Sequence, residues 1–447
     1  MSVSWSSSVD LLLDVRGHPR RAALEDALRA AVAGGRLAAG VRLPSSRVLA
    51  AELGLARNTV ADAYAQLVAE GWLVARQGSG TRVAAGGPGP APVPAPAVRP
   101  RPLFDLTSGA PDVSAFPRAA WQRASRTALS AAPSEALGYP DPRGLPGLRA
   151  VLAAYLARVR GVRTSPEHLV ICSGTTQALY LLATALAPGS VAVESHGLRL
   201  HREVLAPTGT VLPVDADGAD VSRLGDDAAV LLTPAHQFPL GGALSAARRA
   251  AVLDWARAAG SVVIEDDYDG EFRYDRRPIG ALQGLAPDLV AYVGTVSKTL
   301  APGLRLGWIA VPPALLDAVI AAKRLSGGGA GVLEQLTLAT FLAGGGYDRH
   351  IRRSRLRYRK RRDLLVAALD GRASVTGISA GLHALVPVPD EAAVIARAAE
   401  QGLALHGLGH FRAPGGPAAG GLVIGYARPA DHAFAGALTA LQSCYPL

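Results

Sequence analysis

The segment 84–103 is the strongest constraint on how this 447-residue chain folds, because it is rich in proline, alanine and glycine and has no apolar periodicity. Such a composition cannot bury a hydrophobic core, and it is typical of a semi-rigid, partly polyproline linker. We therefore expect a small N-terminal domain over residues 1–83 and a large C-terminal domain over residues 104–447. The length allows each domain a substantial core.

The bulk composition favours a cytoplasmic protein with no membrane span and no metal site. Apolar residues make up 49% of the chain, but Arg, Gly and Pro break them into segments too short to cross a bilayer. No signal peptide is apparent. The two cysteines, Cys172 and Cys444, give neither a disulfide framework nor metal-ligand spacing. The net charge of +10 favours a polyanionic partner.

The N-terminal domain is predicted to contain a helix-turn-helix. Apolar residues on one face predict a helix over 21–33. A serine of the pair Ser45-Ser46 is placed at the N-cap of a second helix that ends at Gly54, and a third helix is predicted over 56–69. Two short helices joined by a tight glycine turn are typical of this DNA-binding motif. Short segments on either side of 77–79 then predict a β-hairpin, or wing.

Three short motifs occur in order in this domain: Leu-Pro-Ser-Ser-Arg at 43–47, Arg-Asn-Thr-Val at 57–60 and Gly-Ser-Gly-Thr at 78–81. On these motifs residues 18–83 resemble the winged helix-turn-helix of the GntR family of bacterial transcription regulators. The resemblance implies binding to double-stranded operator DNA, with Arg57 and Asn58 reaching major-groove base edges. The residues expected to contact DNA are Arg42, Ser45, Ser46, Arg47, Arg57, Asn58, Thr59, Gly78 and Ser79.

The C-terminal domain alternates short apolar runs with helical patterns. This alternation predicts an α/β fold whose mostly parallel sheet is covered by helices. In such folds ligands bind at the carboxyl ends of the strands, so the polar residues that follow each run are candidate site residues. Strands are expected at 169–172, 191–194, 230–233, 262–265 and 289–293, and helices at 176–186 and 246–259.

Lys298 follows the last of these runs and is one of only three lysines in the chain. Arginine supplies nearly all the other positive charge, so a lysine here indicates chemistry that a guanidinium cannot perform. One such reaction is the condensation of a primary amine with an aldehyde. Taken alone, a solvated loop lysine is the alternative. Similarly, the Ser-Gly-Thr-Thr turn at 173–176 is suited to holding a phosphate, but such a turn is more often a simple helix cap.

Four features of the C-terminal domain follow one another along the chain: the turn at 173–176, the Asp-Asp-Tyr-Asp sequence at 266–269, Lys298 and Arg305. In this order they resemble the motifs of fold-type I pyridoxal-phosphate (PLP) aminotransferases. The resemblance implies that an aspartate keeps the pyridine nitrogen protonated. Asp266 is assigned this role, and Asp267 stays open as an alternative because neighbours on a strand face opposite sides.

The same resemblance assigns the other cofactor contacts. Tyr268 would bond the ring hydroxyl, His236 and Gln237 would lie near the ring, and Tyr139 would reach the phosphate bound by the partner subunit. The residues assigned to the phosphate are Ser173, Gly174, Thr175, Thr176, Thr295, Ser297 and Arg305.

With its winged helix, linker and aminotransferase-like domain, nearly the whole chain is identified as a member of the MocR subfamily of GntR regulators. Membership implies a head-to-tail homodimer whose DNA binding is controlled by PLP, an amine or an amino acid. We therefore expect a PLP-dependent transcriptional regulator that is nucleoid-associated when bound to DNA. The alternatives are an active aminotransferase with a DNA-binding appendage and a dimerisation scaffold that no longer uses PLP.

The chain departs from the family pattern at two positions. Leu198 stands where the family usually has a tyrosine near the cofactor, and His196 is either a replacement ring or a satisfied loop histidine. Val423 stands where amino-acid-using relatives have a carboxylate-binding arginine, with Arg412 and Arg428 as the remaining candidate cations. Ordinary α-amino acid transamination is therefore not expected. PLP itself or an unusual amine is the expected signal, as in family members that control PLP synthesis.

The basic run 352–362 has two interpretations. As a helix it would place cations on several faces, with Leu356 and Tyr358 toward the body of the domain. The run is then either a solvated helix face or a second DNA-binding track on the large domain.

Overall fold

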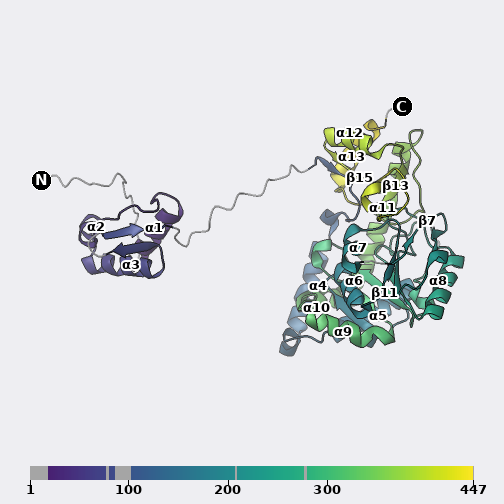
Figure 1. The fold of residues 1–447 in the computed structure, drawn as a ribbon, viewed down its shortest axis with the longest axis horizontal. Helices are drawn as coiled ribbons and strands as arrows, with labels where there is room; N and C mark the ends of the chain where they lie inside the picture. Colours follow the sequence, from purple (N-terminus) through teal and green to yellow (C-terminus); the bar gives the residue numbers. More distant parts are fainter. Residues whose placement is uncertain (1–18, 77–79, 86–101, 207–208, 276–278, 446–447) are drawn as a thin grey trace. The chain divides into compact units, whose positions relative to one another are not determined.

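The computed structural model describes residues 19–76, 80–85, 102–206, 209–275 and 279–445, and the chain divides into two compact units, residues 1–100 and 101–447 (Figure 1). Most of the segment 84–103 lies outside the described residues, as do the predicted wing residues Gly78 and Ser79. No helix in the described ranges is both long and apolar enough to cross a bilayer.

The N-terminal unit has the predicted helix-turn-helix and hairpin. The Ser45 hydroxyl accepts a hydrogen bond from the Val48 N–H at 3.3 Å, and Gly54 ends the second helix in the left-handed conformation with φ of 62°. Buried side chains from all three helices and from the hairpin form one core. The elements are α1 (Arg20–Ala33), α2 (Ser46–Leu53), α3 (Arg57–Ala69), β1 (Leu73–Arg76) and β2 (Gly80–Val83).

A seven-stranded sheet lies at the centre of the C-terminal unit and confirms the predicted α/β architecture. Its strand order is β4-β12-β11-β10-β9-β5-β6, and only β12 runs antiparallel to its neighbours. Each predicted apolar run forms a strand, with ends shifted by two residues at most. The strands are β4 (Leu169–Cys172), β5 (Val191–Glu194), β6 (Val211–Leu212), β9 (Ala229–Leu232), β10 (Val262–Asp266), β11 (Val290–Thr295) and β12 (Gly307–Ala310).

Helices cover both faces of this sheet, so that its central strands are buried throughout. The helices α6 (Thr175–Leu186) and α9 (Leu316–Leu325) pack on one face, and α8 (Ala246–Ala259) packs on the other. Burial on both faces explains why the strands read as continuous apolar runs rather than as alternating patterns. The other helices before the C-terminal lobe are α4 (Arg118–Ala131), α5 (Pro146–Arg160), α7 (Arg199–Leu205) and α10 (Val332–Ala343).

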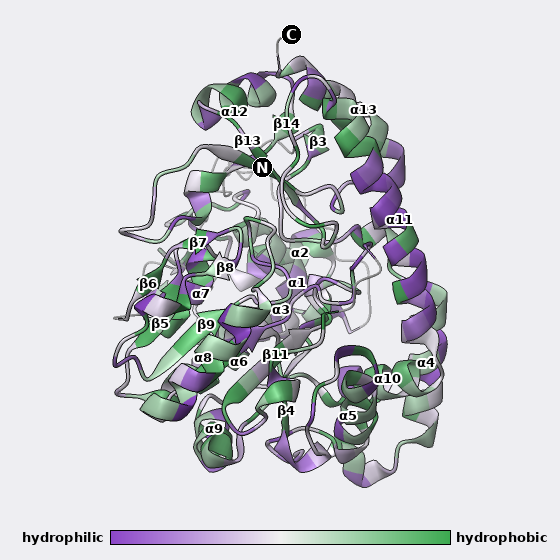
Figure 2. Ribbon diagram, turned by 90° about the vertical axis from the view of Figure 1, so that its right-hand side faces the viewer, coloured by the Kyte–Doolittle hydropathy of each residue, from purple (hydrophilic) through white to green (hydrophobic). Residues whose placement is uncertain are grey.

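A smaller lobe at the C-terminal end contains a three-stranded antiparallel sheet of order β13-β16-β15. The long helix α11 (Gly346–Leu369) contacts α10 at one end and α13 at the other, as Figure 2 shows along one side of the unit. The remaining elements are β3 (Phe104–Asp105), β7 (Val214–Asp215), β8 (Gly218–Ala219), β13 (Ala384–Pro387), α12 (Glu391–Glu400), β14 (Leu403–Ala404), β15 (His406–Gly407), β16 (Gly421–Ile424) and α13 (Asp431–Ser443).

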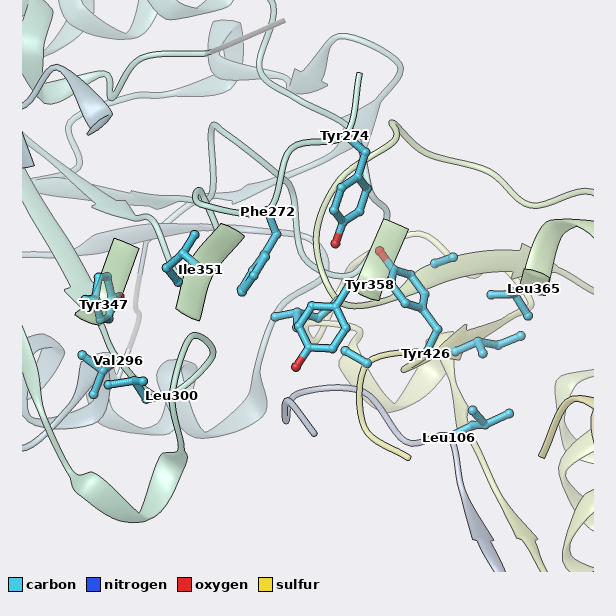
Figure 3. Close-up of a cluster of buried hydrophobic side chains, with 14 of the residues drawn as sticks. Leu106, Phe272, Tyr274, Val296, Leu300, Tyr347, Ile351, Tyr358, Leu365 and Tyr426 are labelled. Carbon is cyan, nitrogen blue, oxygen red and sulfur yellow. The ribbon is translucent and has the colours of Figure 1, made fainter. Parts of the chain in front are cut away.

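The inward face of α11 joins these parts through apolar contacts and one buried cation. Tyr358 on α11 packs edge-on against Phe272, with ring centroids 5.3 Å apart (Figure 3). The Arg361 guanidinium donates to the Asp112 carboxylate at 3.1 Å, to that of Asp431 at 2.5 Å and to the Ala427 carbonyl at 3.0 Å. Arg361 therefore binds two segments that are distant in sequence, around Asp112 and over 427–431, to one helix.

We predict that Arg361→Ala lowers the free energy of unfolding by about 3 kcal/mol, because it leaves the buried Asp112 carboxylate without its cation. Urea unfolding followed by circular dichroism measures this loss. Arg359→Ala is the control on the same helix, because Arg359 is exposed, and it should change stability by less than about 0.5 kcal/mol. Equal effects of the two substitutions would contradict the assignment.

Candidate functional site

A cavity of about 260 Å³ opens where the carboxyl ends of β4, β5, β9, β10 and β11 meet. These strands run parallel to one another, so residues at or just beyond their ends are brought to one edge of the sheet. The strand ends contribute polar side chains to the cavity wall. These are Thr175, Thr176, Glu194, Thr233, Asp266, Thr295, Ser297 and Lys298.

Lys298 lies in the cavity wall and is not a solvated loop residue. Its ammonium donates to the Gly109 carbonyl at 2.5 Å. Burial lowers the pKa of Lys298, although the nearby Asp266 carboxylate opposes this shift. A lowered pKa increases the fraction of neutral amine, which is the form that attacks a carbonyl carbon.

The two adjacent aspartates at the end of β10, which the sequence left as alternatives, have different environments. Asp267 points away from the cavity, where its carboxylate is bound by Arg160 at 2.6 Å and by the Tyr292 hydroxyl at 2.8 Å. Asp266 faces the cavity, and its Oδ1 is buried without a hydrogen-bond partner. Burial raises the pKa of Asp266 to about 7.

Tyr268 faces the same cavity and is held by a histidine behind it. Its hydroxyl donates to the His236 carbonyl at 3.1 Å, and His236 Nδ1 in turn lies 2.8 Å from Asp269 Oδ2. Burial raises the pKa of Tyr268 well above its ordinary value, so the phenol stays protonated, and its single O–H is directed to the His236 carbonyl in the absence of a ligand.

The opposite end of the cavity is lined by hydroxyls and one guanidinium. Thr175 and Thr176 belong to the first turn of α6, which has no side-chain cap, so its N–H groups can bind an anion. Arg305 has the left-handed conformation with φ of 50° and packs against Gly174, where an added Cβ would lie 3.2 Å from the guanidinium. Glycine at 174 thus permits the approach of Arg305. Thr295 and Ser297 complete this end, with their hydroxyls 2.9 Å apart.

Several residues that the sequence assigned to the cofactor do not line the cavity of the single chain. The Gln237 amide lies behind the cavity and donates to Glu194 at 3.1 Å and to two backbone carbonyls, so its position is structural. Ser173 is held through its N–H, which donates to Gln177 Oε1 at 2.7 Å, and its side chain is not in the cavity wall. Tyr139 is fully exposed on the single chain.

The region where the resemblance places a carboxylate-binding arginine is apolar. Val423 is fully buried in a cluster with Phe238, Tyr268 and Phe411, and Leu198 packs against the same cluster. The two candidate replacement cations do not line the cavity. Arg428 is paired with Asp105 at 2.7 Å, and Arg412 is exposed.

Sequence reasoning missed several cavity residues. Arg202 lines the cavity, but its guanidinium donates to the carbonyls of Gly197, Phe411 and Arg412. His201 lies beside Asp266 with Nδ1 and Oδ2 3.6 Å apart, and burial lowers its pKa to about 4. These contacts join separate segments, so no motif predicts them.

Two further histidines line the cavity in neutral form. Burial lowers the pKa of His196 and of His383, and each has an Nε2 atom that is buried without a partner. His383 also approaches His236 and Asp269, and the three offer donor atoms within 4.8 Å of one another. These three residues come from separate segments, and no ligand spacing in the sequence indicates the group.

The predicted DNA-contacting residues of the N-terminal unit are accessible in the described part. Arg42, Arg47, Arg57 and Asn58 are exposed, the last two in the first turn of α3. Ser46 and Thr59 are partly exposed, whereas the hydroxyl of the exposed Ser45 caps α2. The helix that would enter a groove therefore presents Arg57 and Asn58 at its N-terminal end.

We predict that substitutions of the two adjacent aspartates in ligand-free protein have opposite effects on stability. Asp267→Asn should lower the free energy of unfolding by about 3 kcal/mol, because the buried Arg160 loses its counter-ion. Asp266→Asn should raise it at about pH 8, because it removes an unpaired buried charge. Chemical unfolding at about pH 5 and about pH 8 measures both.

The pH dependence of the Asp266→Asn effect follows from the direction in which the pKa of Asp266 shifts on folding. The folded-state pKa of Asp266, about 7, lies above its unfolded value, so folding takes up a proton between these values. The contribution of Asp266 to stability falls as pH rises to about 7 and is lowest above it. The gain from Asp266→Asn should therefore be larger at about pH 8 than at about pH 5, and the reverse order would contradict this prediction.

Comparisons with known protein families match both units. Residues 20–83 match the family described as bacterial regulatory proteins, gntR family, and residues 101–415 match aminotransferase class I and II. The kynurenine aminotransferase of Pyrococcus horikoshii, solved with PMP, has a TM-score of 0.69 and 25% identity over 76% of this chain and 90% of that one.

Curated relatives match over most of the chain. The HTH-type pyridoxine biosynthesis transcriptional regulator PdxR of Corynebacterium glutamicum is 34% identical over 420 residues, covering 90% of this chain and 91% of that protein. The probable rhizopine catabolism regulatory protein MocR of Rhizobium meliloti is 34% identical over 384 residues, covering 78% and 77%. The chain therefore belongs to the MocR-type GntR transcriptional regulators, which join a GntR helix-turn-helix domain to an aminotransferase class I and II domain.

Proposed function

We propose that this regulator binds PLP in the cavity of its aminotransferase-like unit and that PLP itself is the signal that changes its binding to operator DNA. The observation that carries the proposal is the buried, unpartnered Oδ1 of Asp266 in the cavity that also holds Lys298. An unpaired buried carboxylate is costly, and a pyridine N–H would supply its missing partner.

The other cavity residues fit the remaining groups of PLP. Tyr268 would donate to the ring hydroxyl oxygen once its O–H turns away from the His236 carbonyl. The first turn of α6 and Arg305 would bind the phosphate together with the hydroxyls of Thr295 and Ser297. When bound, PLP supplies an aldehyde that condenses with a primary amine. Lys298, with its lowered pKa, is the amine placed to react.

The apolar environment of Val423 supports a sensor rather than a transaminase. An α-amino acid carboxylate requires a cation, and Arg202 is already bound to three carbonyl groups. The cavity also presents neutral imidazoles and a Glu194 carboxyl whose pKa burial raises to about 7. This lining disfavours a second anionic ligand. The name of the Corynebacterium relative suggests vitamin B6 synthesis as the controlled process.

A head-to-tail homodimer is part of this proposal. Tyr139 is fully exposed on the single chain, as expected for a residue that contributes to the partner's phosphate site. An alternative function is an active aminotransferase with a DNA-binding appendage. Steady conversion of an amino donor and a keto acid would favour that alternative.

We predict that PLP gives purified protein a saturable visible absorption band and that Lys298→Arg abolishes it, because arginine keeps the charge but cannot condense with an aldehyde. Absorption titration after dialysis measures the band, and borohydride trapping followed by mass spectrometry locates the modified residue. Lys360→Arg is the control, because Lys360 lies on the exposed side of α11. A band retained by Lys298→Arg would contradict the assignment.

We also predict that PLP, and not an α-amino acid, changes the affinity of the protein for its operator. A duplex selected by the protein from a random-sequence library serves as the operator, and fluorescence anisotropy measures Kd with and without PLP. Lys298→Arg should weaken or remove the response. A response to amino acids with none to PLP would reject PLP as the signal.

Substitution in the recognition helix should affect sequence-specific binding. Arg57→Ala is expected to weaken binding to the selected duplex by about 10-fold to 100-fold, the loss of one base contact worth about 1–3 kcal/mol. Binding to random duplex should weaken much less. Arg21→Ala is the control, because Arg21 is paired with Glu25 on α1 at 2.7 Å. Uniform weakening on both duplexes would assign Arg57 to phosphate instead.

A further inference from the structure

We propose that the outward face of α11 is a second DNA-binding surface, carried by the aminotransferase-like unit itself. The surface consists of Arg352, Arg353, Arg359 and Lys360, with Leu356 between them, and is called the α11 basic stripe. All five residues are exposed. Figure 2 shows α11 as a long hydrophilic ribbon at the edge of the unit.

The stripe results from helical periodicity. Residues three and four apart lie on one side of a helix, which places Arg352, Leu356, Arg359 and Lys360 in one line. Tyr358 is buried on the other side, as expected from the sequence, but the expectation that Leu356 also faces the body is wrong, because Leu356 is 70% exposed. Two residues along a helix differ by about 200°, so both could not face inward.

The cations of the stripe are not neutralised by nearby acids. Between Asp348 and Asp363 helix α11 contains no acidic residue. None of the four stripe cations forms an ion pair within the ranges that the structure describes, and Asp348 itself is paired with Arg158 at 2.8 Å. A solvated helix usually alternates charges of both signs. A row of one sign along one face favours a polyanion instead.

The inward arginine of the same run has a different role. Arg361 is buried and bound to carboxylates and a backbone carbonyl. This arginine of the basic run therefore stabilises the fold. Folding therefore accounts for Arg361, but it does not account for the unpaired cations of the stripe. Those four side chains contribute charge to the surface without stabilising a partner.

Duplex DNA fits the dimensions of the stripe. From Arg352 to Lys360 a helix rises about 12 Å, which spans about three to four phosphates along one strand of B-DNA. The winged helix of the same chain already binds DNA, so the stripe acts on a duplex held at high effective concentration. The stripe would contact phosphates beside the operator and would not read bases.

Cleavage of DNA from a tethered iron chelate tests contact directly in the full-length protein. The two native cysteines, Cys172 and Cys444, are buried, so Leu356→Cys directs the reagent to the middle of the stripe. Bound to the selected duplex with flanks of about 30 base pairs, this conjugate should cut the flanking DNA. Leu285→Cys is the matched control, because Leu285 is 64% exposed and is not on α11. Cleavage no greater than the control would overturn the proposal.

The salt dependence of affinity provides the second readout. Arg359→Gln/Lys360→Gln should flatten the slope of log Kd against log salt by about 1.8 per protomer, because two phosphate contacts are lost. Arg123→Gln/Arg126→Gln removes the same charge from exposed positions of α4 and should leave the slope unchanged. An unchanged slope in the α11 variant would reject the stripe. Retained selection of the duplex would show that the winged helix still functions.

Discussion

The buried ion pair between Arg160 and Asp267 decides how the end of β10 is used. Strand alternation sends adjacent residues to opposite faces, and the pair satisfies the carboxylate that points away from the cavity. The neighbouring Asp266 is then free to face the cavity with one oxygen unpaired. Because both carboxylates are buried, the strand could not tolerate two unpaired charges here. One aspartate thus supports the fold, and the other is available to a ligand.

The unpaired carboxylate lowers stability in the ligand-free protein, and this cost has a consequence for ligand binding. A ligand that donates a hydrogen bond to Asp266 removes the desolvation cost in the bound state only. Ligand binding to the folded protein then adds to stability by mass action. The same reasoning applies to the N–H groups in the first turn of α6, which have no side-chain cap.

Sequence patterns predicted the local elements well because the patterns are themselves local. The caps at Ser45 and Gly54, the apolar strands and the position of Lys298 depend on neighbours within a few residues. The choice between Asp266 and Asp267 depends on which face of the sheet holds the cavity, and one strand carries no such information. The amide of Gln237 was assigned to the cofactor for a related reason, because its bonding to Glu194 is a tertiary contact.

The inward and outward faces of α11 illustrate the same limit. Periodicity alone excludes Leu356 and Tyr358 from facing the same way, but a basic run has too few apolar residues to show which face is buried. Arg361 lies on the buried side together with Tyr347, Ile351, Tyr358 and Leu365, and its partners Asp112 and Asp431 are far away in sequence. A charged residue is therefore part of the buried face, and hydropathy could not identify it.

These contacts also connect the cavity physically to the start of the C-terminal unit. Lys298 donates to the Gly109 carbonyl, and three residues later Asp112 is bound by Arg361 and donates its N–H to the Tyr358 hydroxyl at 3.2 Å. A Lys298 amine engaged elsewhere cannot hold Gly109 in the same way. A ligand shifts a conformational equilibrium only through contacts that differ between the two states. The bond from Lys298 to Gly109 would be such a contact for a ligand that engages the lysine, and Gly109 lies on the segment that directly follows residues 84–103.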